Sequence, residues 1–351
     1  MTSTLDSSPI RPERRRGHPW PRRCLIAAVL GLLTVELALG RPALTSALTQ
    51  LRAPHPGWLL AALVAAMAAM GAYARMQRRL LLSGGLFVPL HRELALTYAA
   101  HSLNETLPGG LVFSTQLNYQ QMRRFGASPA VASWCIALSG ILSTSALAVV
   151  TALGALAAHG NPSWLTLVAL TAAVLLITVG IRWITRHPGT LLPLVRTALA
   201  RINRLRRRPT DHGLEQIRTY LDQLRAARLT PRHATAAATY ALLNWLLDAG
   251  CLWLCLHSVT DQAITPTQLL LAFCAGMAAG TLTIVPGGLG IIDNALILGL
   301  ITGGLDTPTA IAAVVLYRLI NLGFVIGAGW IAWGLVLRRT RREQPQRISM
   351  G

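Results

Sequence analysis

A proline and several glycines interrupt a long uncharged stretch near the end of the chain. No charged residue occurs between Asp261 and Asp293, yet this stretch contains Pro286-Gly287-Gly288-Leu289-Gly290. Proline lacks a backbone N–H donor and glycine adds backbone freedom, so this sequence breaks any helix that reaches it. A fold for this chain must therefore hold irregular backbone inside apolar surroundings.

The composition indicates what surrounds that break. Hydrophobic residues make up 53% of the chain and charged residues 13%, with a mean hydropathy of +0.48. A soluble protein usually carries about 25% charged residues. We therefore predict an all-α, polytopic transmembrane helical bundle. In hydrocarbon a freed backbone group finds no water, so a break is tolerated only where it faces protein or a wet cavity.

A second break lies in the first half of the chain. Pro108-Gly109-Gly110 follows Asn104 and Glu105 within a mostly apolar region. Transporters build substrate sites near the middle of the membrane from interrupted helices of this kind. We predict two broken, re-entrant helical hairpins, one around each Pro-Gly-Gly.

The arginines predict the orientation. The formal net charge is +19, and the chain contains no lysine. Arginines gather in both tails, in Arg75 to Arg79 after an expected span over 57–74, in Arg123-Arg124, and in the segment 182–232. The positive-inside rule places these groups on the cytoplasmic side. We expect a multi-pass protein of the cell (cytoplasmic) membrane with both termini cytoplasmic, and no nucleic-acid partner.

With that orientation the two broken hairpins enter from opposite sides, which predicts an inverted repeat. The expected organisation is a basic tail (1–23), a single transmembrane domain (24–337) and a C-terminal tail (338–351). Within the domain, a first repeat covers about 57–185 and a second about 233–337. The basic segment 186–232 between them fits an amphipathic helix on a membrane face and a solvated linker equally well.

Cysteines give no sign of a metal centre. Cys251 and Cys255 lie one helical turn apart with His257 nearby, but a metal site needs more convergent ligands. We expect them to pack as small apolar side chains. The sequence also lacks a nucleophile–base pair and a Walker loop, so we expect no cofactor and no enzymatic activity.

Three ionisable residues, Asp248, Asp293 and Arg318, lie in otherwise apolar segments. A charge at the membrane centre costs about 2.5–3.5 kcal/mol on translocon scales. We expect Arg318 to pair with Asp293, Asp248 or both. The pair is either part of a transport site or an ion pair that only joins two helices.

The half-helices that begin after each Gly-Gly offer free N–H groups, which suit a phosphate or carboxylate. Arg318 would add a planar donor fork matched to phosphate. Asp293 falls in the first turn of its half-helix, where a carboxylate is favourable. We expect Asp293 to occupy the site until a substrate anion or a proton displaces it, and Asp248, Asp293 and Glu105 are the candidate proton carriers. The candidate substrate-binding residues are Asn104, Glu105, Pro108, Gly109, Gly110, Asp248, Pro286, Gly287, Gly288, Gly290, Asp293 and Arg318.

Four motifs resemble one known family. They are Asn104-x-x-Leu107-Pro108-Gly109-Gly110, Trp245-Leu246-Leu247-Asp248-Ala249, Pro286-Gly287-Gly288-Leu289-Gly290 and Tyr317-Arg318-Leu319. Together they are similar to the lysylphosphatidylglycerol synthase transmembrane-region family, over about Leu25 to Leu337. The resemblance implies a bundle with re-entrant helices and movement of a lipid between leaflets.

The chain departs from the family's pattern in two places. Asp293 stands where the family often has Glu, and Leu111-Val112 stands where a further Gly is common. Some members carry a soluble aminoacyl-transferase domain after the membrane part. Only Arg338 to Gly351 follows the last expected span here, so we expect the membrane part without the synthase domain.

Two functional hypotheses follow. The first is a lipid translocase whose partners are membrane lipids, anionic or phosphate-bearing, with the headgroup crossing a polar cavity between the repeats. The second is a non-transporting partner that docks a separately encoded lipid-modifying or glycosyltransferase enzyme through the basic segment 186–232. The sequence predicts no oligomeric state.

Overall fold

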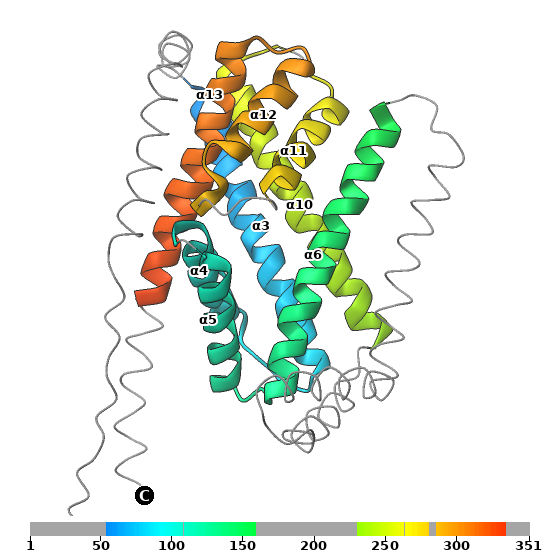
Figure 1. Cartoon of the computed structure of the whole chain (residues 1–351), viewed down its shortest axis with the longest axis vertical. Helices are drawn as coiled ribbons and strands as arrows, with labels where there is room; N and C mark the ends of the chain where they lie inside the picture. Colours follow the sequence, from blue (N-terminus) through cyan, green and yellow to red (C-terminus); the bar gives the residue numbers. More distant parts are fainter. Residues whose placement is uncertain (1–53, 108, 159–229, 263, 281–285, 335–351) are drawn as a thin grey trace, which may run out of the picture.

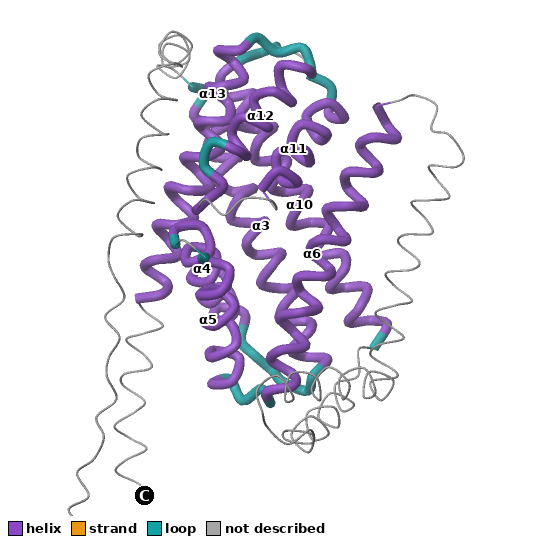
Figure 2. Tube along the Cα trace, viewed as in Figure 1, coloured by secondary structure: helices purple, strands orange, loops and turns teal. Residues whose placement is uncertain are grey.

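The computed structural model describes residues 54–107, 109–158, 230–262, 264–280 and 286–334, and within these ranges it is all-helical with no strand (Figures 1 and 2). This confirms the predicted fold class. Both tails, the expected spans over 24–40 and 163–181, and the basic segment up to residue 229 lie outside the described residues. The predicted domain boundaries stay predictions.

Four described helices are long and apolar enough to cross a membrane. They are α3 (Pro56–Ser83), α6 (Pro129–Ala158), α10 (Pro231–Val259) and a final helix over Thr307–Gly334. The final helix consists of α13 (Thr307–Arg318), a π-helical turn η3 (Leu319–Val325) and a further α-helical stretch. Its first turn is capped by Asp306, whose carboxylate accepts a hydrogen bond of 3.2 Å from the Thr309 N–H.

The helix α3 runs well past the predicted end of its span at Ala74. Its arginines lie inside the helix, and Arg78 donates from Nε to the carbonyl of Val88 at 2.8 Å. The helix ends only at Gly84, where the chain turns. Charge therefore marks the end of the apolar segment but not the end of the helix.

The first Pro-Gly-Gly forms the tip of a helical hairpin. The helix α4 (Leu90–Thr106) ends just before it, and α5 (Gly110–Arg124) begins just after it. Gly109 has a φ of 69°, in the left-handed region that favours glycine. A Cβ on Gly110 would lie 2.2 Å from the backbone oxygen of Asn104, so the two helices approach too closely for a side chain there. The predicted break is confirmed.

The second Pro-Gly-Gly forms the tip of another hairpin. It links α11 (Pro266–Gly280) to α12 (Ile291–Thr302) through a 3₁₀ turn, η2 (Pro286–Gly288). Gly287, Gly288 and Gly290 have φ values of 65°, 59° and 81°. Residues 281–285, between α11 and η2, lie outside the described residues. This break, too, is where the sequence predicts it.

In Figure 1 the two hairpins extend from opposite ends of the bundle, and their tips lie near its middle. The turn η2 packs on α4. A Cβ built on Gly287 would lie 3.4 Å from the backbone oxygen of Glu105, so the tips touch. That the hairpins are re-entrant in a membrane, and that the halves form an inverted repeat, stay predictions.

Two clusters of buried apolar side chains hold the bundle. One lies around α10, α11, α12 and α13, and the other lies where α3, α4, α5 and α6 meet. The helix α10 packs along α3 and joins the two halves. Cys251 and Cys255 are fully buried in the first cluster beside Leu252, which confirms their predicted packing role.

Candidate functional site

A cavity of about 340 Å³ lies between the hairpin tips and the helices α3, α10 and α13. Its size is within the roughly 300–1,000 Å³ of small-molecule pockets. Its wall is mixed, with apolar residues such as Ala66, Met70 and Leu322. The polar and ionisable lining residues are Tyr73, Gln77, Thr97, His101, Asn104, Glu105, Ser114, Asn118, Ser143, Asn244, Trp245, Asp248, Tyr317, Arg318 and Asn321.

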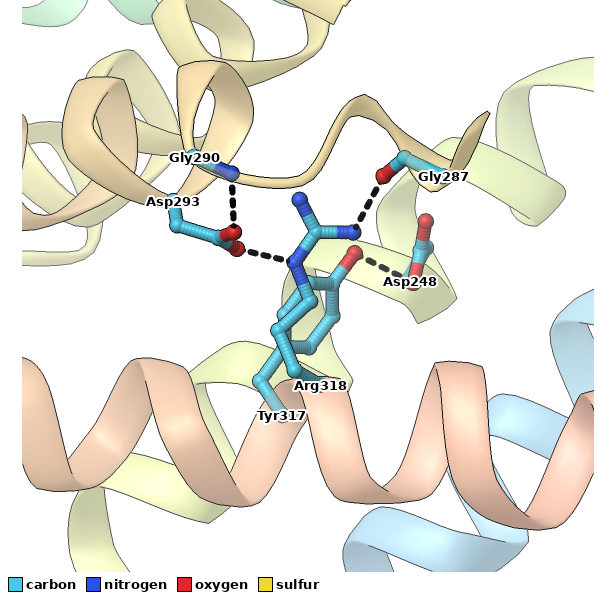
Figure 3. A network of polar contacts seen from close by, with 6 residues as sticks. All are labelled: Asp248, Gly287, Gly290, Asp293, Tyr317 and Arg318. Atoms are coloured by element: carbon cyan, nitrogen blue, oxygen red, sulfur yellow. Dashed lines mark hydrogen bonds and ion pairs between the residues drawn. The ribbon is translucent and has the colours of Figure 1, made fainter. Parts of the chain in front are cut away.

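Arg318, at the end of α13, connects the second hairpin to the cavity (Figure 3). Its Nε donates to Asp293 Oδ1, and its Nη1 donates to the carbonyl of Gly287 at 3.2 Å. The other carboxylate oxygen of Asp293 accepts the N–H of Gly290 at 2.8 Å. The side chains of Arg318 and Asp293 are 14% and 23% exposed, so this ion pair is largely removed from solvent.

The third nitrogen of Arg318 has no partner within the part of the chain that the structure describes. Nη2 is buried and has no hydrogen-bond partner among the described residues. A guanidinium carries five N–H donors, and an anion that bound here would satisfy two of them. The arginine is thus held in place by protein groups on one edge and retains donors for a further acceptor.

Asp248 is held by donors that the sequence analysis did not name for it. Its Oδ1 accepts the hydroxyl of Tyr317 at 3.1 Å and the Nδ2 of Asn321 at 3.2 Å (Figure 3). Of the pairings left open by the sequence, Arg318 makes its ion pair with Asp293, while Asp248 is held by neutral donors. Two carboxylates therefore lie near one arginine, in distinct settings.

The first hairpin supplies the opposite wall. Asn104 donates from Nδ2 to Oε1 of Glu105 at 2.9 Å, and both residues line the cavity. The carboxylate of Glu105 also lies beside the second tip, since a Cβ on Gly287 would be 3.8 Å from its Oε2. Acidic groups from both hairpins thus lie around the same tip contact.

The candidate residues named from the sequence divide into three groups. Asn104, Glu105, Asp248 and Arg318 line the cavity. Asp293 and Gly287 hold Arg318, and Gly290 holds Asp293. Gly109, Gly110, Pro286 and Gly288 shape the two tips, and Pro108 lies outside the described residues. That these residues bind substrate stays a prediction.

Sequence reasoning missed Tyr317 and Asn321 as partners of Asp248. A signal existed for Asn321, because it lies one turn after Arg318 in an otherwise apolar span. The π-helical turn that begins at Leu319 left no such signal, and π-turns occur frequently at functional sites. The wall that faces α6 was also missed: Trp245 donates from Nε1 to the carbonyl of Ser143 at 2.8 Å.

The apolar helices and the comparison with protein families both indicate a membrane protein. The family model described as "Lysylphosphatidylglycerol synthase TM region" matches residues 23–329. A comparison with curated proteins gives no match. The matched family is a membrane domain, and the protein is a multi-pass membrane protein. Because the match covers most of the chain, including both hairpins and Arg318, the protein belongs to the lysylphosphatidylglycerol synthase TM region family.

Proposed function

We propose that the protein is a lipid translocase of the flippase type. In this proposal an anionic or phosphate-bearing lipid headgroup, with or without sugars, crosses the cavity while its tails stay in the bilayer. The protein acts in the cell membrane with both termini cytoplasmic, and it performs no covalent chemistry on the lipid.

The observation that carries the proposal is the state of Arg318 in the cavity wall. A guanidinium in a largely enclosed site normally uses its donors, because unsatisfied buried polar groups are costly. Here Nη2 donates a hydrogen bond to none of the described groups. A phosphate oxygen is the acceptor that a planar guanidinium fork matches best, so the free edge of Arg318 supports an anionic ligand.

Asp293 gives the site a way to release that ligand. Without a headgroup, Asp293 neutralises Arg318. A headgroup phosphate would compete with Asp293 for the same guanidinium, which keeps binding moderate, and a carrier must let its substrate leave on the far side. The second carboxylate, Asp248, stays tied to Tyr317 and Asn321 and does not compete directly.

The size of the cavity supports a headgroup but not a whole lipid. About 340 Å³ is at the lower end of pockets that hold small molecules. Acyl or prenyl chains are as apolar as the bilayer itself, so they lose nothing by staying outside. A polar cavity that takes only the headgroup therefore removes the main barrier to leaflet exchange, the transfer of charge through hydrocarbon.

The experiment uses purified protein in vesicles with labelled lipids that share the same tails. Exchange between leaflets is measured for anionic phosphatidylglycerol and for an uncharged glucosyl diacylglycerol, which carries no phosphate, with wild-type protein and with Asp293→Asn. We expect faster exchange of the anionic lipid by the wild type and background exchange by a folded Asp293→Asn. Equal exchange of both lipids, or an active Asp293→Asn, would contradict the proposal.

A further inference from the structure

Glu93 is a fully buried carboxyl group that the proposed translocation step does not use. It lies in the first turn of α4 with 0% of its surface exposed. Neither Oε1 nor Oε2 has a hydrogen-bond partner among the residues described. A buried charge without a partner is strongly disfavoured, and such groups take up a proton instead.

Among the described residues, the groups that act on Glu93 offer no counter-ion in contact with it. Tyr73 and Arg78 act on it from α3, and Cys135 acts on it from α6. The guanidinium of Arg78 is engaged elsewhere: its Nε binds the Val88 carbonyl, and it lies over the ring of Phe87 at 5.2 Å. The other described elements packed on α4, namely α5, η2 and η3, bring no charged group that acts on Glu93.

Two further buried oxygens without described partners lie on α3 and on α4, the helix that carries Glu93. Gln77 Oε1 and Thr97 Oγ1 are buried and also lack partners in the described ranges. The side chains of Gln77 and Thr97 are on α3 and α4, which pack on one another. A proton on Glu93 adds a donor to a group of buried oxygens, whereas an ionised Glu93 adds only acceptors.

Glu93 is also connected to the cavity through the helix that carries it. Glu93, Thr97, His101 and Glu105 follow at intervals of four residues, so they lie along one face of α4. The last three line the cavity, and Glu93 lies one turn beyond it, toward the end of the bundle that carries Arg78 and Arg92.

We propose that Glu93 is a proton-binding site, linked to the cavity by Thr97 and Gln77, whose protonation is coupled to headgroup movement. The coupling rests on the proposed function; the proton site itself does not. We call the contact between α3 and α4 the seam. One proton from water binds the Glu93 carboxylate when the seam closes around this side chain, and the proton returns to water when the seam opens. No other bond forms or breaks.

The coupling has a definite direction. In the structure α3 and α4 are packed together and Glu93 is fully buried, so protonation favours this conformation. An ionised Glu93 requires water or a counter-ion and favours a conformation in which the seam is open. A carrier that alternates between the two therefore takes up and releases a proton at Glu93 in each cycle.

The test compares Glu93→Gln with its exposed neighbour Arg92→Gln, because glutamine has the shape of a protonated glutamate. Infrared difference spectra between acid and alkaline pH report protonated carboxyl groups directly, without any transport. We expect a carboxylic acid carbonyl band in the wild type and in Arg92→Gln that is missing from Glu93→Gln. A Glu93→Gln protein with an unchanged spectrum overturns the proton site.

Leaflet exchange measured against pH, in the same vesicles, tests the coupling. We expect the exchange rate to change with pH in the wild type and in Arg92→Gln, and to become independent of pH in Glu93→Gln. An unchanged pH profile in Glu93→Gln overturns the coupling. Wild-type protein that exchanges no lipid at any pH overturns the proposed function instead, while the infrared comparison still decides the proton site.

Discussion

At the scale of single residues, the contact between Arg318 and Asp293 is the feature on which the account depends. The arginine comes from the final helix and the aspartate from the first turn of α12, so the pair joins the second hairpin to the bundle. The N–H of Gly290 and the carbonyl of Gly287 hold it from either side. Such a pair both stabilises the fold and presents a charge.

A double-mutant cycle measures the first of these roles. Arg318→Gln and Asp293→Asn each leave one largely buried charge without its partner, and the double variant removes both. We expect a coupling free energy of about 0.5–3 kcal/mol in the free energy of unfolding, measured by detergent titration. Additive effects of the two substitutions would mean that the contact contributes nothing to the fold.

The same double variant separates a transport site from a structural ion pair. It has no unpaired charge, so a purely structural pair predicts that leaflet exchange recovers relative to either single variant. A headgroup site predicts that exchange stays at background, because the guanidinium that binds the headgroup is gone.

At the scale of elements, the first hairpin depends on the closeness of its two helices. A Cβ on Gly110 would lie 2.2 Å from the oxygen of Asn104, whereas one on Gly140 in α6 would meet nothing within 4 Å. We expect Gly110→Ala to destabilise the protein by about 1–3 kcal/mol through overpacking. Gly140→Ala should raise stability by about 0.5–1 kcal/mol, as usual within a helix. Thermal unfolding in detergent compares them, and equal midpoints would show that the tip is more open than described.

The elements also show what a sequence can reveal. Proline and glycine chemistry is local, so the sequence predicts both breaks: α5 begins at the first Pro-Gly-Gly, and the second forms the turn η2 before α12. Translocon energetics predicted that Arg318 would have an acidic partner. The choice between Asp248 on α10 and Asp293 on α12 depends on how these two helices pack against α13, and the isolation of Glu93 depends on the packing of α3 against α4. How two helices pack against each other is a property of the pair, so it leaves no pattern in the sequence of either helix.

At the scale of the whole molecule, the basic segment 186–232 distinguishes translocation from the docking of a separate enzyme. Replacing Arg204, Arg206, Arg207 and Arg208 with glutamine removes four positive charges from that segment. A translocase should keep its exchange activity in vesicles that contain no other protein. A non-transporting docking partner would instead exchange no lipid in these vesicles, with the wild type as with the variant.

The central claim is that headgroups cross through the cavity between the hairpin tips. Two neighbours on α6 test it: Ser143 lines the cavity, and Thr144 is exposed on the outer surface of the helix. Ser143→Phe fills the cavity without changing any charge, and Thr144→Phe adds the same ring outside it. The measurement is leaflet exchange of a labelled anionic lipid in vesicles that contain each folded variant. The account predicts background exchange with Ser143→Phe and near wild-type exchange with Thr144→Phe; wild-type exchange with Ser143→Phe would contradict it.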